Sequence, residues 1–237
     1  MSFSLKYLGH SCVLIESCRG KKIILDPFLT GNQYAAIKPE DITELDVILV
    51  SHGAHDHLGD TVSLAKRTGA TVYCGPDVYD YCVYHGVDKQ QLCGMVWGTY
   101  WDYKGVTLRS VEAKHISYFP CGDVKITGIP MSFIITLEDG TGIYFSADTA
   151  IFSDMKFFGQ LYPVKYGFFC MGNFPGLAFE MDGKEAALAA SLFDVEVAFP
   201  IHCPPDSPYI PEFKEELSKL SPKTKAVALQ PGESYSA

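Results

Sequence analysis

The chain has 237 residues, of which 47% are hydrophobic and 20% are charged. The length suits one large domain or two small ones, and the composition argues against disorder because a sizeable core can form. The formal net charge is −9, from 19 Lys and Arg residues against 28 Asp and Glu residues. Since an acidic surface repels phosphate backbones, we do not expect nucleic acid as a partner.

The sequence predicts neither a membrane segment nor an export signal. The longest apolar runs, such as Val47–Val50 and Val197–Ile201, are far shorter than the roughly 20 residues of a membrane helix. The N-terminal residues lack the basic and long apolar regions of a signal peptide. The eight cysteines include no CxxC pair, and we interpret most of them as small, buried apolar groups. We therefore expect a reduced, cytoplasmic protein without a membrane partner.

Short strands alternate with helices in the first half of the chain. Strands are predicted where apolar or β-branched runs lie between glycines and polar turns, namely over Phe3–Leu8, Cys12–Glu16, Lys22–Leu25 and Leu45–Val50. Asp60 and Gly69 are typical first and last flanking residues of a helix, so we expect a helix between them. A strand over Thr71–Cys74 and a second helix, capped by Asp77 and ending near Gly86, follow. This alternation predicts an α/β fold.

The second half has the same character. Strands are expected over Val106–Ala113, Ser132–Leu137, Gly142–Ser146, Tyr166–Cys170, Val195–Ile201 and Ala226–Leu229. A hairpin turn at Glu138–Gly140 joins two of them. Helices are expected over Lys184–Leu192, with Asp182 as the cap, and over Glu212–Leu220. No linker or repeat interrupts the chain. We therefore expect a single domain over residues 1–237, with two sheets sandwiched by helices.

The densest group of reactive side chains is the run His52-Gly-Ala-His55-Asp56-His57. It directly follows Leu45–Val50, which is nearly all apolar and typical of a strand buried on both faces. Loops at the carboxyl ends of such strands carry the sites of α/β folds. Imidazole and carboxylate groups at short spacing are ligands for zinc and similar divalent metals, so this run predicts a metal site.

Three further candidate ligands, His115, Asp148 and His202, also follow predicted strands. Side chains retained for packing have no reason to collect at strand ends. The alternative is that they are satisfied polar groups of loops and helix caps, which is more credible for one residue than for the whole set.

The metal-ligand candidates resemble the metallo-β-lactamase superfamily pattern H-x-H-x-D-H…H…D…H. Further stretches are similar to a family of poorly characterised metal-dependent hydrolases, near the ascorbate-6-phosphate lactonase-like branch: Leu8–Ser11, Leu25–Asn32, His57–Asp60, Ala147–Ala150 and Gln230–Tyr235. The resemblance spans nearly the whole chain and is specific for fold and metal site, but weak for substrate. It implies the four-layer αββα sandwich of the metallo-β-lactamase fold, in agreement with the predicted strands and helices.

The resemblance also implies one or two divalent ions, with zinc favoured and manganese, iron or nickel as alternatives. The first ion would be bound by His52, His115 and a bridging Asp148. The second ion would be bound by the set Asp56, His57, Asp148 and His202.

One departure weakens the first of these two sites, because the pattern's second histidine falls at Ala54, which cannot bind metal. His55 either replaces the missing ligand, if the loop shifts, or points away from the metal. We favour the second alternative, since successive side chains in extended backbone face opposite directions.

The resemblance implies a hydrolase in which a metal-bound hydroxide attacks a small ester, lactone or phosphodiester. Asp56 would bind metal and orient or deprotonate the nucleophile. Asp26 would orient a ligand by hydrogen bonding, although capping the turn before Pro27 explains it equally well. His10 would either reach the pocket or satisfy the backbone of its own turn.

Two departures from the family pattern bear on catalysis and on substrate choice. The loss at Ala54 could mark a degenerate, non-catalytic member that binds a metal or another ligand, although a decayed site should lose several ligands rather than one. The stretch Gly172–Ala178 looks longer than the family's loop and either rims the site, altering substrate choice, or is a surface insertion. The expected partner is a small-molecule substrate. An exposed aromatic patch near Val96–Tyr103 would favour a homo-oligomer.

Overall fold

The computed structural model describes residues 2–121, 123–173 and 178–237. It divides into two compact units, and each is described by itself. The first unit comprises Met1–Trp97, Ile116–Met131 and Gln230–Ala237, and the second comprises Gly98–His115 and Ser132–Leu229. A single domain over residues 1–237 stays a prediction.

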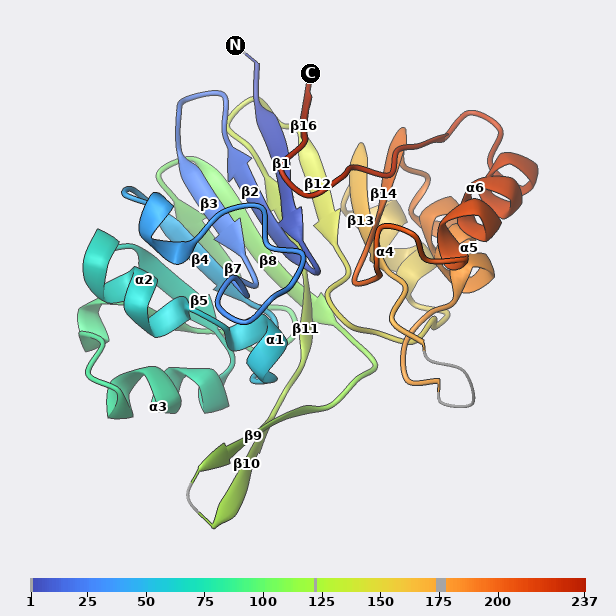
Figure 1. The fold of residues 1–237 in the computed structure, drawn as a ribbon. Coiled ribbons are helices and arrows are strands. Elements are labelled where there is room, and N and C mark those ends of the chain that lie inside the picture. Colours follow the sequence, from blue (N-terminus) through green and yellow to red (C-terminus); the bar gives the residue numbers. More distant parts are fainter. Residues whose placement is uncertain (1, 122, 174–177) are drawn as a thin grey trace. The chain divides into compact units, whose positions relative to one another are not determined.

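The first unit is built on a seven-stranded mixed sheet in the order β16-β1-β2-β3-β4-β5-β6 (Figure 1). The strands are β1 (Ser4–Gly9), β2 (Cys12–Glu16), β3 (Lys22–Leu25), β4 (Val47–Val50), β5 (Thr71–Cys74), β6 (Leu92–Gly94) and β16 (Ser234–Ser236). Strands β3 to β6 are parallel, whereas β16, β1, β2 and β3 pair antiparallel. The carboxyl ends of β3 and β4 therefore meet at one edge of the sheet, where the histidine-rich run begins.

Helices of the first unit cover a face of this sheet (Figure 1). They are α1 (His55–Leu58), α2 (Thr61–Thr68) and α3 (Pro76–Tyr84), with 3-10 turns at Pro39–Asp41 and Lys89–Gln91. Helix α2 contacts β4 and β5, and α3 contacts β6 and the hairpin of β9 (Ser117–Cys121) and β10 (Val124–Gly128). Leu8, Ile24, Ile48, Leu64 and Val72 belong to one buried core cluster, which holds α2 on the sheet.

The second unit holds most of another seven-stranded sheet, in the order β15-β14-β13-β12-β11-β8-β7. The strands are β7 (Tyr100–Tyr103), β8 (Val106–Glu112), β11 (Met131–Thr136), β12 (Gly142–Phe145), β13 (Tyr166–Cys170), β14 (Val197–Ile201) and β15 (Lys225–Ala226). Strands β12 to β15 are parallel, and the antiparallel pair of β11 and β12 is joined by the expected turn. The carboxyl ends of β12, β13 and β14 consequently lie at the same edge.

Three helices, α4 (Met155–Leu161), α5 (Gly183–Phe193) and α6 (Tyr209–Leu220), pack together in the second unit (Figure 1). Helix α5 begins with a capping box: Asp182 accepts a hydrogen bond from the Glu185 backbone N–H, and Glu185 accepts one from that of Asp182. Its buried Ala186 and Ala190 carry only methyl groups, and the Tyr144 ring stacks on Phe193 with centroids 3.8 Å apart. Small side chains therefore allow α5 to lie close to its neighbours.

The predicted α/β class is confirmed, as are the bounds of β2, β3, β5 and β13. The predicted cap of α3 is wrong, because the helix begins at Pro76 with Gly75 as its N-cap. Asp60 occupies the N-cap position of α2 but makes no capping hydrogen bond. Its carboxylate instead accepts hydrogen bonds from the backbone N–H groups of Leu29 and Thr30, at 3.0 and 2.8 Å. The last predicted strand is shorter than expected and ends at Ala226.

No helix in the described part of the chain is long and apolar enough to cross a membrane. The cysteines whose side chains the structure describes are free thiols: Cys12, Cys18, Cys74, Cys82, Cys93, Cys170 and Cys203. Burial raises the pKa of Cys12 and Cys74 well above the ordinary value and raises that of Cys82 to about 12. These three thiols are therefore neutral packing groups, as the sequence predicts.

Replacing Asp182 by alanine should lower the free energy of unfolding by about 0.5–2 kcal/mol, because α5 loses its N-terminal cap. Urea denaturation of the purified chain measures the change. Asp182→Ser is the matched control and should retain most of the stability, since a serine hydroxyl also accepts at this position. Equal stability of Asp182→Ala and the unmodified chain would contradict the assignment.

Candidate metal-binding clusters

The histidine-rich run starts where β4 ends. Strand β4 is buried throughout, and the chain remains buried at His52, which is 1% exposed. Ala54 then forms the N-cap of α1, whose single turn buries His57. The side chain of His55 is 87% exposed. This orientation agrees with the alternative in which His55 points away, and Ala54 offers no ligand atom.

The carboxylate of Asp26, at the end of β3, joins this loop to the neighbouring strand. Its Oδ1 accepts from the Ser51 backbone N–H at 2.8 Å, and its Oδ2 accepts from the Ser51 hydroxyl at 2.7 Å. The same Oδ2 lies 2.7 Å from Nδ1 of His57, and both side chains are fully buried. Asp26 therefore contacts the candidate ligand His57 directly, in addition to its position in the turn before Pro27.

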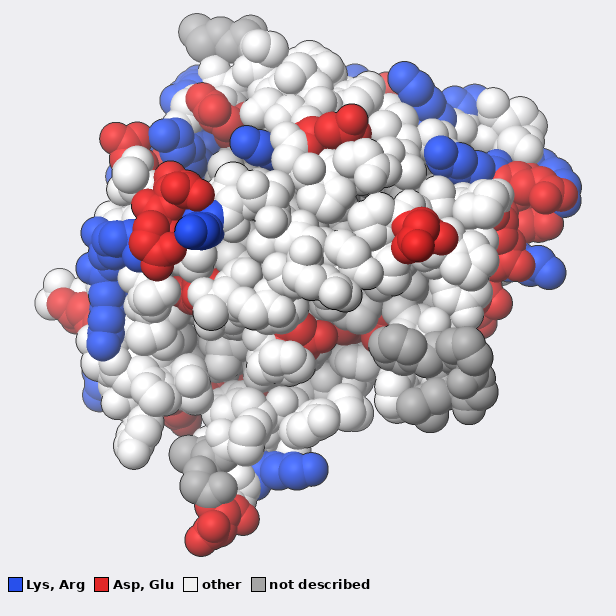
Figure 2. Space-filling view, in the orientation of Figure 1, with Lys and Arg blue, Asp and Glu red and all other residues white. Residues whose placement is uncertain are grey.

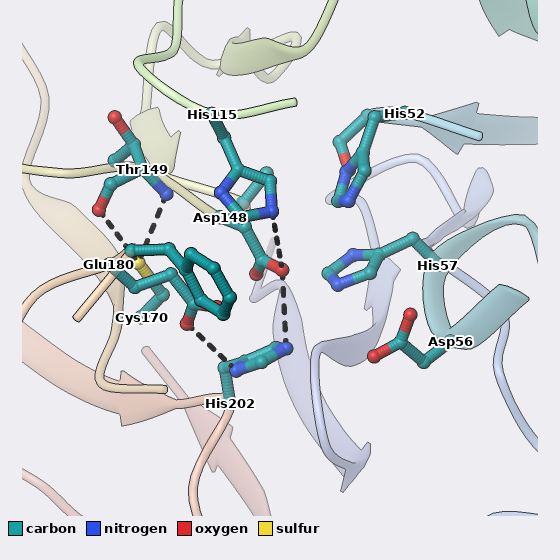
Figure 3. Close-up of polar contacts among 12 residues, drawn as sticks. His52, Asp56, His57, His115, Asp148, Thr149, Cys170, Glu180 and His202 are labelled. Carbon is teal, nitrogen blue, oxygen red and sulfur yellow. Dashed lines mark hydrogen bonds and ion pairs between the residues drawn. The ribbon is translucent and has the colours of Figure 1, made fainter. Parts of the chain in front are cut away.

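These hydrogen bonds fix the tautomers of both buried histidines. The Ser51 hydroxyl has one proton and gives it to Asp26, so Nδ1 of His52, 2.9 Å from that hydroxyl, must donate its own proton to Ser51. Nδ1 of His57 donates to Asp26 because a carboxylate can only accept. In the neutral form of both rings, Nε2 then carries the lone pair. The two rings lie side by side with centroids 4.1 Å apart (Figure 3).

His10 and Asp56 complete the group in the first unit. Nε2 of His10 lies 3.6 Å from Oδ2 of Asp56, whose side chain is 26% exposed. The His10 ring also lies edge-on to that of His57, with centroids 5.7 Å apart. The backbone carbonyl of His10 accepts from the Tyr7 hydroxyl at 2.9 Å. The His10 side chain thus reaches the loop that carries the candidate ligands.

Two hydrogen bonds between buried groups, which no sequence pattern indicates, hold the start of this loop. The Gly53 N–H donates to the Ser117 hydroxyl at 2.8 Å, and that hydroxyl donates to Oδ2 of Asp77 at 2.5 Å. A Cβ on Gly53 would collide with the Phe119 ring. No local pattern indicates this contact, because it joins residues from α3, β9 and the loop after β4.

His115, Asp148 and His202 form a second group, which lies in the second unit. Oδ2 of Asp148 is 3.2 Å from Nε2 of His202 and 3.8 Å from Nε2 of His115 (Figure 3). Asp148 is 3% exposed. Each of the three residues comes from the loop after a strand of the second sheet, namely β8, β12 and β14. The sequence analysis placed all three at strand ends, and the structure brings them together.

Backbone contacts connect two of these loops. The Lys114 N–H donates to the Thr149 hydroxyl at 2.8 Å, and the Ala150 N–H donates to the Lys114 carbonyl at 3.1 Å. His115 and Asp148 therefore flank residues that are hydrogen-bonded to each other. Burial, followed by the nearby carboxylates of Glu180 and Asp148, raises the pKa of the Cys170 thiol well above its ordinary value. Cys170 is thus a neutral packing group and not a thiolate ligand.

Cys203, directly after His202, packs against the core of the second unit. Burial raises the pKa of its thiol to about 12. A protonated, half-buried thiol is a poor nucleophile, so Cys203 is a packing group.

Glu180 joins the second group, although no sequence pattern indicates it. Its side chain is buried, and Oε2 lies 3.0 Å from Nδ1 of His202 (Figure 3). His115, Asp148 and Glu180 each offer one potential ligand atom, and these atoms lie within 4.8 Å of one another. Glu180 follows no strand, so its position carries no recognisable signal. Of the stretch Gly172–Ala178, residues 174–177 lie outside the described part of the chain.

Comparison with known proteins identifies the family. A family model described as a beta-lactamase superfamily domain matches residues 21–203. A UPF0173 metal-dependent hydrolase of Methanopyrus kandleri is 36% identical over 98% of both chains. A second one, of Pyrococcus abyssi, is 38% identical over 97% of both chains.

Solved structures agree with these relatives. Igni18, a metallo hydrolase from Ignicoccus hospitalis, matches with a TM-score of 0.84 and 27% identity over 100% of this chain and 99% of that one. The metallo-beta-lactamase fold protein YhfI from Bacillus subtilis matches with a TM-score of 0.73 and 14% identity, covering 100% and 99%. These likenesses confirm the predicted metallo-β-lactamase fold. The chain belongs to the beta-lactamase superfamily and, within it, to the UPF0173 family of metal-dependent hydrolases.

Proposed function

We propose that the chain binds two divalent metal ions, zinc in the first instance, and hydrolyses a small ester, lactone or phosphodiester in the cytoplasm. The observation that carries the proposal is the Asp26 network. One buried carboxylate accepts a hydrogen bond from Nδ1–H of His57 and another from the Ser51 hydroxyl, which in turn accepts from Nδ1–H of His52. Histidine ligands of metals characteristically donate their other ring N–H to such an acceptor, which orients the ring and raises its basicity.

The donor set is chemically suited to metal. It consists of imidazole nitrogens and carboxylate oxygens, which zinc, manganese and iron accept. His57 and Asp148 are 0% and 3% exposed. Burying a carboxylate such as Asp148 is costly unless a positive charge compensates it, and a bound cation supplies that charge. We propose that the ligands are those named by the sequence pattern: His52, Asp56, His57, His115, Asp148 and His202.

Divalent ions, when bound, lower the pKa of coordinated water to about 7 and polarise the group under attack. The chain's residues then orient and move protons. Asp56 keeps a quarter of its side chain exposed, so its carboxylate can reach a water molecule and accept its proton. His10, 3.6 Å from that carboxylate, is placed to hold Asp56 in position. No serine or cysteine nucleophile is needed.

Surface charge supports a small substrate over a polynucleotide. In the face shown in Figure 2, Lys and Arg side chains are interspersed with Asp and Glu side chains and do not form one broad basic area. The chain as a whole has a net charge of −9. A long phosphate backbone needs a continuous basic surface to bind, whereas a small ester needs only a local site. The free thiols support a reducing compartment, such as the cytoplasm.

Metal content per chain tests the proposal directly. Protein purified without chelator should contain about two ions per chain, as two-metal hydrolases do, and His57→Ala should contain fewer. His85→Ala is the matched control, since His85 is the C-cap of α3 and its ring contacts that of Tyr81. The unmodified chain should hydrolyse a member of an ester, lactone and phosphodiester panel, and removal of metal should abolish the activity.

Two results would contradict this proposal. A chain that contains no metal, even after zinc or manganese is added, would exclude a metal-dependent reaction. A chain that keeps its metal but hydrolyses nothing in the panel would favour the degenerate, non-catalytic alternative, to which the loss of a ligand at Ala54 points.

Asp26→Asn should weaken metal binding by about 10- to 100-fold, the usual cost of losing an outer partner of a metal ligand. An asparagine amide has one acceptor oxygen, so in either orientation its NH2 group faces an N–H or O–H donor that the Asp26 carboxylate accepts from. Metal titration of the purified variant measures the loss. Asp46→Asn is the control, because Asp46 accepts from Lys21 and Lys22 away from the histidines. Equal metal affinity in the two variants would show that Asp26 is only a structural group.

A further inference from the structure

Glu180 is a buried acid that neither the sequence pattern nor the proposed function uses. It is 6% exposed. Its backbone N–H donates to Oδ1 of Asn173 at 2.9 Å, and the same atom accepts from the Phe179 N–H at 3.0 Å. These bonds fix the backbone that carries the Glu180 carboxylate.

The chain leaves room for this carboxylate at Gly172. A Cβ built on Gly172 would collide with Oε2 of Glu180 and with Nδ1 of His202. Only glycine at this position therefore allows the carboxylate and the imidazole to meet at 3.0 Å without a shift. This close approach joins residues from three separate segments: Gly172 after β13, Glu180 before α5 and His202 after β14.

The residues near Glu180 are candidate ligands of the first ion. By the sequence pattern, His115 and Asp148 bind this ion, and Ala54 deprives it of one histidine. The structure places a carboxylate oxygen of Glu180 within 4.8 Å of the ligand atoms of both His115 and Asp148. A carboxylate has about four lone-pair sites on its two oxygens. Glu180 can thus lie against Nδ1 of His202 and still offer a lone pair to a cation.

We infer that Glu180 is a metal ligand that binds the first ion together with His115 and Asp148, and that it supplies the donor that the sequence pattern places at residue 54, where this chain has alanine. The inference rests on the proposed function. The exchange replaces a neutral nitrogen donor by a charged oxygen donor. Oxygen ligands favour harder ions, so the first site should bind manganese better, relative to zinc, than a site with the pattern's histidine.

A competing role is that Glu180 only orients His202 through Nδ1. Both roles predict weaker metal binding when Glu180 is lost, but they differ in what restores it. A direct ligand at the first ion is replaceable by a histidine at position 54, where the pattern has one. An orienting partner of His202 is not, because His202 belongs to the second ion.

The test uses four proteins: the unmodified chain, Glu180→Gln, Ala54→His and the double variant. Each is stripped of metal and titrated with zinc and, separately, with manganese, with stoichiometry from elemental analysis and affinity from calorimetry. Glu196→Gln is the matched control, because Glu196 lies in the same unit and pairs with Lys165 at the surface. Thermal melts of the metal-free proteins establish that each variant folds.

Glu180→Gln should bind about one ion in place of two, with the affinity for the lost ion reduced beyond the roughly 100-fold that an outer partner accounts for. The double variant should regain the second equivalent of zinc. The ratio of manganese to zinc affinity should fall from the unmodified chain to the double variant. If Ala54→His does not fold, a greater loss of manganese than of zinc in Glu180→Gln carries the same conclusion.

Three outcomes would overturn the inference. Two ions bound by Glu180→Gln with unchanged affinity would show that Glu180 is not a ligand. A folded double variant that still binds one ion would show that Glu180 acts through His202. If Ala54→His does not fold, an equal loss of zinc affinity and manganese affinity in Glu180→Gln would also contradict the inference. If the unmodified chain binds no metal, the proposed function itself fails. That result is distinct from the three outcomes above, which concern only Glu180.

Discussion

The Asp26 carboxylate is the contact on which the geometry of the first cluster depends. It lies at the carboxyl end of β3 and accepts hydrogen bonds from the backbone and side chain of Ser51, directly after β4. It also accepts a hydrogen bond from Nδ1–H of His57. Because it is fully buried, these contacts face no competition from water. One side chain thereby ties two parallel strands together and fixes the ring orientation of two histidines.

Strained backbone conformations occur at residues of both candidate clusters. Non-glycine residues with positive φ are uncommon, and four of those in the described part of the chain are His10 (60°), Asp26 (43°), Ala147 (50°) and His202 (58°). All four belong to or adjoin the candidate clusters. Such conformations persist where surrounding contacts over-determine them, and they are typical of functional sites. The backbone at these strand ends is therefore strained, and the buried strands beside it hold the strained conformations in place.

Sequence reasoning succeeded where the signal is local. Apolar runs between turns predicted β2, β3, β5 and β13, and the positions after strands pointed to His115, Asp148 and His202, which lie together. It failed where the decisive contact is between distant segments. The Asp77 carboxylate is used by Ser117 and not by its own helix, and Glu180 lies against His202 only because Gly172 leaves room. No periodicity or spacing encodes such contacts, so they emerge only from the fold.

Anomalous diffraction from crystals grown with manganese or zinc would test the central claim most directly, since it locates each ion among the side chains. The account predicts two peaks, one against His57 and the other against His115, Asp148 and Glu180. An ion bound only at surface carboxylates, or no peak at the histidines, would contradict it. A single peak against His57 would leave the second ion in place and remove Glu180 from the ligands.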